Sequence, residues 1–224
     1  MDEPALIGQD DFVSYVRPPV TAPVFHDAEG RVIEYGRRWV GSPPEDAYSV
    51  DADLERFAPL HVIADALITH LRDTYDVEID EGMDVLTDLF RQPSHGVVRV
   101  VRIRPNRPSC ATLSLALTDY PGVFLHAGAI REAQYPVCGC NACDSNWPDE
   151  AENLEREVFA VVNGTFRETL IDTPAPVIDF ASVYPDGSIS GQAFGEEIPV
   201  ERWQAALELL RDRPDGWAPW PRRP

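Results

Sequence analysis

The chain has 224 residues, of which 38 are acidic and 19 are basic, so its formal net charge at pH 7 is −19. A surface of this sign repels phosphate backbones and anionic lipids, which argues against nucleic acid and membranes as partners and favours a basic protein. All 19 basic residues are arginine, so a Schiff-base lysine, a lysine general base and a Walker-type phosphate loop are excluded. Plain solubility is the simpler explanation of the charge.

The beginning of the chain indicates where the protein resides. Residues 1–4 are acidic and no apolar segment follows them, so we expect no signal peptide. The longest apolar runs are too short to span a bilayer. We therefore predict a cytoplasmic protein, in which thiols stay reduced. The use of arginine alone is typical of a bacterial genome rich in G and C.

The first half of the chain predicts an irregular start and then a helix. Residues 1–20 show no regular pattern, and turn residues between 22–26 and 31–35 indicate a hairpin. Pro59 is suited to the first position of a helix, which an apolar stripe extends over 59–75. Acidic and apolar residues alternate over 76–82, which favours a strand with one solvated face over a calcium loop.

The middle of the chain predicts a sheet. Residues 97–103 are rich in β-branched side chains, as a central strand is. Strands over 111–118 and 123–130 flank a turn, which we centre between Tyr120 and Pro121. This register places His126 on the apolar face and Cys110 opposite Arg131.

The last third predicts two helices around a hairpin. The helices are expected over 148–171, with a bend or tight packing at Gly164, and over 200–211. The hairpin joins 177–183 to 188–193, and residues 214–224 are expected to be irregular. We therefore predict one α+β domain over residues 1–224, with an antiparallel or mixed sheet of about five or more strands and three main helices packed on it.

Three of the four cysteines lie within six positions, at Cys138, Cys140 and Cys143. Zinc in a structural site takes four tetrahedral nitrogen or sulfur ligands. The predicted hairpin register makes Cys110 the best fourth ligand, ahead of Asp144 and His126. A Cys₄ zinc site, free thiols and a local disulfide all remain open.

Other polar residues favour structural roles. A histidine flanked by Leu125 and Ala127 on a strand is more often a core residue than a catalytic base. Four arginines on and after the strand at 97–103 could bind an anion, although pairing with neighbouring acids is the simpler expectation. These arginines are Arg99, Arg102, Arg104 and Arg107.

Three segments together resemble a known family: "YSVDADLERFAPLHVIADALITHLRDTYDVE", "CGCNACD" and "DEAENLEREVFAVVNGTFRE". They resemble an uncharacterised family of actinobacterial proteins, a domain of unknown function that covers nearly the whole chain. The resemblance implies a bacterial cytoplasmic single domain and assigns no activity or functional residues.

The sequence contains no recognisable catalytic set, so we assign no catalytic residues. We expect a cytoplasmic, non-catalytic binding or interaction protein whose cysteine loop holds a structural zinc. The alternative is a thiol-dependent or metal-assisted enzyme that uses Cys138, Cys140 or Cys143.

Overall fold

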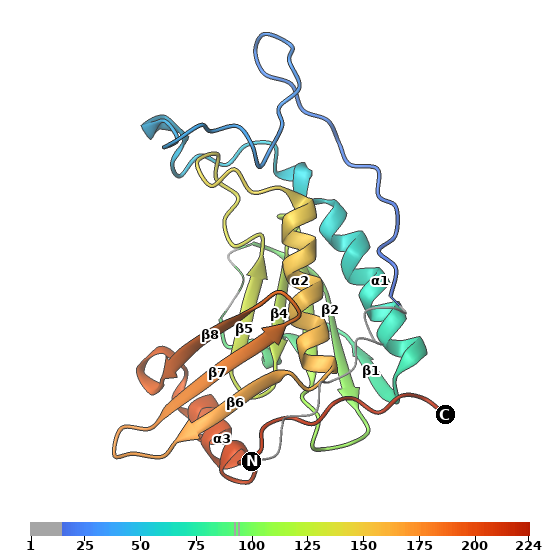
Figure 1. Ribbon diagram of the computed structural model, residues 1–224, viewed down its shortest axis with the longest axis vertical. Helices are drawn as coiled ribbons and strands as arrows, with labels where there is room; N and C mark the ends of the chain where they lie inside the picture. The colour runs from blue at the N-terminus through green and yellow to red at the C-terminus, as the bar shows by residue number, and fades with distance from the viewer. Residues whose placement is uncertain (1–14, 92, 94) are drawn as a thin grey trace.

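A computed structural model describes residues 15–91, 93 and 95–224. Two antiparallel sheets form its framework (Figure 1). In the five-stranded sheet the strands lie in chain order, which gives β1 (Val77–Glu81), β2 (Val97–Pro105), β3 (Leu113–Thr118), β4 (Val123–Ala127) and β5 (Arg131–Tyr135). The three-stranded sheet consists of β6 (Phe166–Ile171), β7 (Val177–Tyr184) and β8 (Gly187–Phe194).

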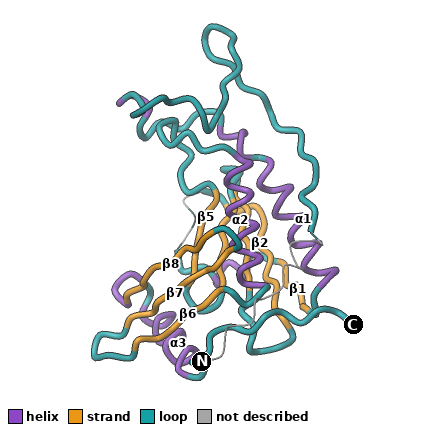
Figure 2. Tube along the Cα trace, viewed as in Figure 1, coloured by secondary structure: helices purple, strands orange, loops and turns teal. Residues whose placement is uncertain are grey.

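Helices pack on these sheets. The α-helices are α1 (Pro59–Thr74), α2 (Trp147–Val162) and α3 (Val200–Arg211), and the short 3-10 helices are η1 (Glu45–Ala47), η2 (Leu54–Phe57), η3 (Met83–Asp88) and η4 (Gly195–Glu197). Figures 1 and 2 show α1 and α2 side by side across the five-stranded sheet. The predicted α+β fold, with an antiparallel sheet and three main helices, is therefore confirmed. None of the helices in the described part of the chain combines the length and apolarity that a bilayer crossing requires.

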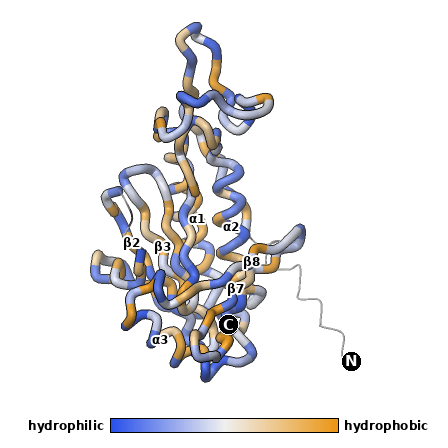
Figure 3. The backbone as a smooth tube through the Cα atoms, turned by 90° about the vertical axis from the view of Figure 1, so that its left-hand side faces the viewer, coloured by the Kyte–Doolittle hydropathy of each residue, from blue (hydrophilic) through white to orange (hydrophobic). Residues whose placement is uncertain are grey.

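The helices begin where local chemistry favours them. Pro59 is the first residue of α1, and the buried side chains of that helix recur at helical spacing from Leu60 to Leu71. Asn146 caps α2, because its side-chain oxygen accepts a hydrogen bond from the backbone N–H of Asp149 at 3.0 Å. Figure 3 shows hydrophobic and hydrophilic stretches alternating along α2, as in an amphipathic helix. The main apolar core lies between these helices and the sheet.

The second helix is shorter than the predicted 148–171. It ends at Val162, and Gly164 follows with φ of +70°, a conformation that reverses the chain. A Cβ atom at Gly164 would lie 2.8 Å from the backbone nitrogen of Pro219, so only glycine fits. Phe166 and Leu170 then belong to β6. Their separation of four residues fits one face of a strand as well as one face of a helix, which explains the error.

The pairing of β3 with β4 differs from the prediction by one residue. Leu115 lies opposite Leu125, and the chain turns through three residues between Thr118 and Gly122. A shift of one residue moves every side chain to the other face of a strand. His126 therefore lies opposite Ser114, on the face away from the leucines and α1.

The ends of the described chain lie against the body without forming regular elements. Residues 15–57 (the N-terminal arm) contain no α-helix or β-strand, and Figure 2 shows this arm as loop apart from its short 3-10 helices. The predicted hairpin in the arm is reduced to an isolated bridge between His26 and Val32. The predicted irregular segment 1–20 lies largely outside the described residues. Residues 214–224 form no helix or strand, yet Trp217 and Trp220 are buried.

Candidate metal centre

Three thiols converge in the loop that joins β5 to α2. The Sγ atoms of Cys138, Cys140 and Cys143 all lie within 4.8 Å of one another, and those of Cys138 and Cys140 are 3.3 Å apart. Cys140 is buried, Cys138 is half-buried and Cys143 is exposed, and all three are free thiols. A tetrahedral ion bound to each sulfur at about 2.3 Å would hold the sulfurs about 3.8 Å apart. These three cysteines could therefore hold a metal ion.

The N-terminal arm pairs with the backbone of the cysteine loop. The N–H of Asn141 donates to the carbonyl of Val50 at 2.8 Å, and the N–H of Ala142 donates to the carbonyl of Ala47 at 3.0 Å. Asp51 and Cys140 form an isolated antiparallel bridge. The backbone of the loop is therefore held by the arm, about ninety residues away in sequence.

Arg56 holds the cysteine loop through hydrogen bonds to its backbone carbonyls. It is only 3% exposed, and its guanidinium donates to the carbonyls of Gly139 at 2.6 Å and Ser145 at 3.2 Å. The same guanidinium lies over the rings of Tyr35 and Phe57, at 4.2 and 4.3 Å from their centroids. Burial lowers the pKa of Arg56, although a guanidinium stays protonated at neutral pH. Carbonyl oxygens and ring faces thus stabilise a buried cation.

Arg38 also holds the loop, through one backbone carbonyl and one carboxylate. Its Nη2 donates to the carbonyl of Asn141 at 2.7 Å, and its Nε pairs with the carboxylate of Asp144. The backbone N–H of Arg38 also donates to Asp144, at 2.9 Å. Asp144 was a secondary candidate for the fourth ligand, but its carboxylate is engaged by Arg38 instead.

The three sulfurs share their protons unequally. The pKa of Cys140 is lowered to about 7, chiefly because its sulfur accepts a hydrogen bond from the backbone N–H of Cys143. Burial opposes this shift, and a hydrogen bond from the thiol of Cys138 assists it. Donation of its proton toward Cys138 and Cys140 raises the pKa of Cys143 to about 12. A metal ion would displace these protons, because thiolates are the species that coordinate.

The structure does not bring Cys110 to the other three thiols. Cys110 lies shortly before the start of β3, and its Sγ donates to the carbonyl of Pro219 at 3.3 Å. The cysteine loop lies beyond the opposite end of β3, where Gly139 packs against Tyr120. The six residues of β3 span about 20 Å. Cys110 is therefore too far away to share a metal ion with the other three thiols. The reason is that β5 runs from the end of the sheet near Cys110 to the opposite end, where the cysteine loop begins.

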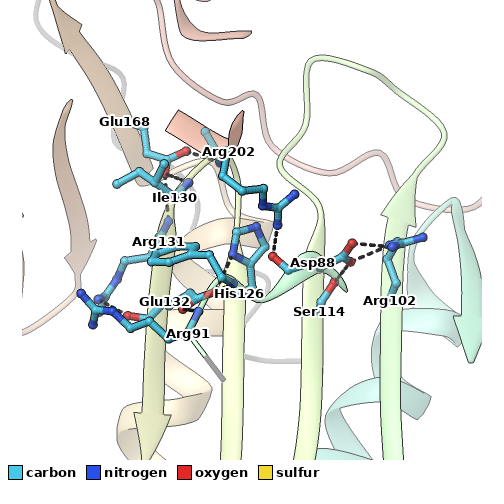
Figure 4. Close-up of polar contacts among 12 residues, drawn as sticks. Asp88, Arg91, Arg102, Ser114, His126, Ile130, Arg131, Glu132, Glu168 and Arg202 are labelled. Atoms are coloured by element: carbon cyan, nitrogen blue, oxygen red, sulfur yellow. Dashed lines mark hydrogen bonds and ion pairs between the residues drawn. The ribbon is translucent and has the colours of Figure 1, made fainter. Parts of the chain in front are cut away.

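A second polar cluster covers the face of the sheet opposite α1 and α2 (Figure 4). The carboxylate of Asp88 accepts hydrogen bonds from Ser114 at 2.5 Å and from Nε of Arg102 at 2.6 Å. Glu132 accepts the backbone N–H of Phe90 at 2.7 Å, and its carboxylate lies 3.6 Å from Nδ1 of the buried His126. His126 is therefore a buried residue among polar side chains and does not lie on the apolar face where the sequence placed it.

The arginines of β2 are paired with acids. Arg99 contacts Asp65 and Glu81, and Arg104 contacts Glu78 at 2.8 Å. Arg102 is engaged by Asp88. These pairs match the simpler of the two expectations for this strand, and they leave no shared anion site among those three arginines.

Replacing Asp88 by asparagine should reveal the strength of this second cluster. Hydrogen bonds from Arg102 and Ser114 outweigh the opposing effect of burial and hold the pKa of Asp88 below its ordinary value. The folded state thus prefers the carboxylate, and its contribution is lost as the pH falls through the folded-state pKa. We expect Asp88→Asn to cost about 1–3 kcal/mol at pH 7 and much less at an acidic pH below the folded-state pKa of Asp88.

Urea unfolding at the two pH values measures this difference. Asp73→Asn is the matched control, because the Asp73 side chain is 62% exposed and should matter by less than about 0.5 kcal/mol. An equal cost for Asp88→Asn at both pH values would show that the carboxylate charge does not contribute.

Fold and site together define a class of protein: an α+β protein with a three-cysteine loop between an antiparallel sheet and a helix. The chain belongs to the family of unknown function DUF6226, whose family model matches residues 21–224. Membership in an uncharacterised family, which the sequence resemblance implied, is thereby confirmed. The comparisons with curated proteins and with solved structures gave no match.

The sequence interpretation missed the two arginines that hold the loop. Arg56 and Arg38 lie in a turn-rich segment without periodicity, and their partners are backbone carbonyls far along the chain. One signal was available for Arg56. It directly precedes Phe57 and the start of α1, and a long side chain at such a position can be buried along apolar surface.

Proposed function

We propose that this chain is a non-catalytic binding protein in which Cys138, Cys140 and Cys143 hold a structural zinc ion. The observation that carries the proposal is the convergence of three sulfurs within 4.8 Å in a loop that the N-terminal arm holds. Sulfur ligands select zinc among the divalent ions that cells supply in quantity. The acidic chain, with net charge −19, favours a basic protein as the partner.

Bound zinc would supply a crosslink between sulfurs and would perform no reaction. The residues of the chain do the remaining work. Arg56 and Arg38 hold the carbonyls of Gly139 and Asn141, which lie between successive cysteines and so set the direction of each thiol. Because the loop also pairs with the arm, metal binding should stabilise the contact between the arm and the body.

Metal content and stability test the proposal. We expect about one zinc per chain in untagged protein purified without chelators. Cys143→Ser should lose most of this zinc and lower the melting temperature. Cys110→Ser should keep the wild-type zinc content and melting temperature. The control is matched because serine can still donate to Pro219 from position 110. Wild-type protein without metal, or equal loss in both variants, would contradict the zinc site.

One observation favours a second candidate, a metal-assisted or thiol-dependent enzyme. The site has three protein thiols with Cys143 exposed, and catalytic zinc sites keep one position open in this way. Cobalt substitution distinguishes the two candidates. A change in the visible spectrum of the cobalt protein on adding imidazole would indicate an open position and support the enzyme. An unchanged spectrum would indicate that a fourth group of the chain closes the coordination and would support the structural role.

A further inference from the structure

A cavity of about 690 Å³ opens where the two sheets meet. It lies along β5, an edge strand of the five-stranded sheet, and is bordered by α2 and by the turn between β7 and β8. This volume is in the range of sites for small organic ligands. Nothing in the metal proposal uses this cavity, since none of the three cysteines lines it.

The lining of the cavity holds more arginines than acids although the chain is strongly acidic, and Arg131 is paired with Glu157 at 2.7 Å. Three arginines line it, together with two acids whose charges are already engaged. Of these acids, Glu132 accepts the backbone N–H groups of Phe90 and Arg91, and Asp186 pairs with Arg156.

Two of the arginines keep donors available for a ligand. Arg91 forms no ion pair within the described part of the chain, and its guanidinium lies 5.7 Å from the centroid of the Phe90 ring. Arg131 uses Nε on Glu157 at 2.7 Å and Nη1 on the carbonyl of Glu132 at 3.0 Å. Its Nη2 has no hydrogen-bond partner among the described residues. Guanidinium groups with free donors are suited to carboxylates and to tetrahedral oxyanions.

The rest of the lining is aromatic and apolar. Phe124, Tyr135 and Tyr184 contribute rings, and Val137 and Ile189 contribute aliphatic surface. The hydroxyl of Tyr184 is held by Glu157 at 2.6 Å, so its ring is fixed in place. A ligand that suits this lining has a planar apolar body and carries a negative charge.

We propose that this cavity binds a small organic anion with a planar, apolar body, such as an aromatic carboxylate or sulfonate. The free donors of Arg91 and Arg131 contact the anionic group, and the ring faces contact the body. Asp186 lowers the affinity for an anion, because it competes for Arg156 at the rim.

Calorimetric titration of the full chain with three naphthalene probes tests the inference. The probes are naphthalene-1-sulfonate, neutral naphthalene-1-methanol and cationic 1-naphthylmethylammonium, which share one ring system. We expect the anion to bind at least about tenfold more tightly than the other two. Equal affinities of the three probes, or no heat with the sulfonate up to about 1 mM, would overturn the proposal.

Variants locate the binding. Arg91→Gln should weaken sulfonate binding about three- to tenfold, and Asp186→Asn should strengthen it about two- to fivefold. Arg104→Gln is the matched control for charge, because Arg104 is an exposed arginine on β2 outside the cavity. An equal effect of Arg104→Gln would show a general charge effect and contradict the site. A gain of affinity in Asp186→Asn cannot result from misfolding, and its absence would count against the inference.

The cavity and the metal centre can fail separately. Cys143→Ser should leave sulfonate binding unchanged, because Cys143 does not line the cavity. Loss of sulfonate binding in that variant, with the fold intact by circular dichroism, would contradict an independent ligand site.

Discussion

Replacing Arg56 by methionine should lower the free energy of unfolding by about 2–4 kcal/mol, because several buried carbonyls lose their donor. Methionine fills a similar volume between the rings of Tyr35 and Phe57. It cannot donate to the carbonyls of Gly139 and Ser145. The loss is therefore one of hydrogen bonds and not of packing.

The same variant should loosen the cysteine loop. Gly139 lies between Cys138 and Cys140, so without Arg56 the thiols no longer have a fixed direction. We expect faster alkylation by iodoacetamide in the metal-free protein and weaker zinc binding in the loaded one. Arg56→Lys should recover only part of the stability, since one ammonium cannot reach carbonyls on several sides.

Urea unfolding at pH 7 measures the stability change, and Arg72→Met provides the control. Arg72 is on α1, its side chain is 53% exposed and it pairs with the exposed Asp73, so its loss should cost less than about 0.5 kcal/mol. Similar costs for Arg56→Met and Arg72→Met would show that the buried guanidinium does not hold the loop.

Elements with a local cause could be predicted from the sequence. Pro59 and the apolar stripe after it define α1, and 200–211 was predicted with the bounds that α3 has. The hairpin of β7 and β8 follows from the turn residues between its strands. In each case the signal lies within the segment that it describes.

The errors arose where distant residues decide the outcome. Gly164 ends α2 in a left-handed conformation, and the backbone of Pro219, about fifty residues later, lies where a Cβ would be. The convergence of Cys138, Cys140 and Cys143 could be predicted, since all three lie within six consecutive residues. The place of Cys110 could not, because it depends on β5, which the sequence interpretation did not separate from the loop.

The other large effect should come from Glu168, whose carboxylate joins the two sheets. Glu168 is on β6 and is completely buried. It accepts the backbone N–H groups of Ala129 and Ile130, both at 2.8 Å, in the turn between β4 and β5. It also accepts the indole N–H of Trp217 at 2.9 Å. One side chain therefore ties together both sheets and the C-terminal segment.

Burial raises the pKa of Glu168, although the hydrogen bonds from these donors oppose the shift. The folded state therefore holds the proton of this carboxyl more tightly than the unfolded chain does. Its titration makes wild-type stability fall as the pH rises from the unfolded-state pKa to the folded-state pKa. Glu168→Gln should remove this part of the pH dependence, which urea unfolding at several pH values measures.

Glu168→Leu should cost about 3–5 kcal/mol at pH 7, because leucine leaves the buried N–H groups of Ala129, Ile130 and Trp217 without an acceptor. Glu168→Gln should cost less, since its amide oxygen can still accept from some of them. The exposed Glu208 on α3 is the control, and Glu208→Leu should change stability by less than about 0.5 kcal/mol. Tryptophan fluorescence, to which Trp217 contributes together with the four other tryptophans of the chain, follows the urea unfolding. If Glu168→Leu unfolds at the wild-type urea concentration, the carboxylate does not hold the sheets together, and apolar packing between β6 and the β4–β5 turn must do so instead.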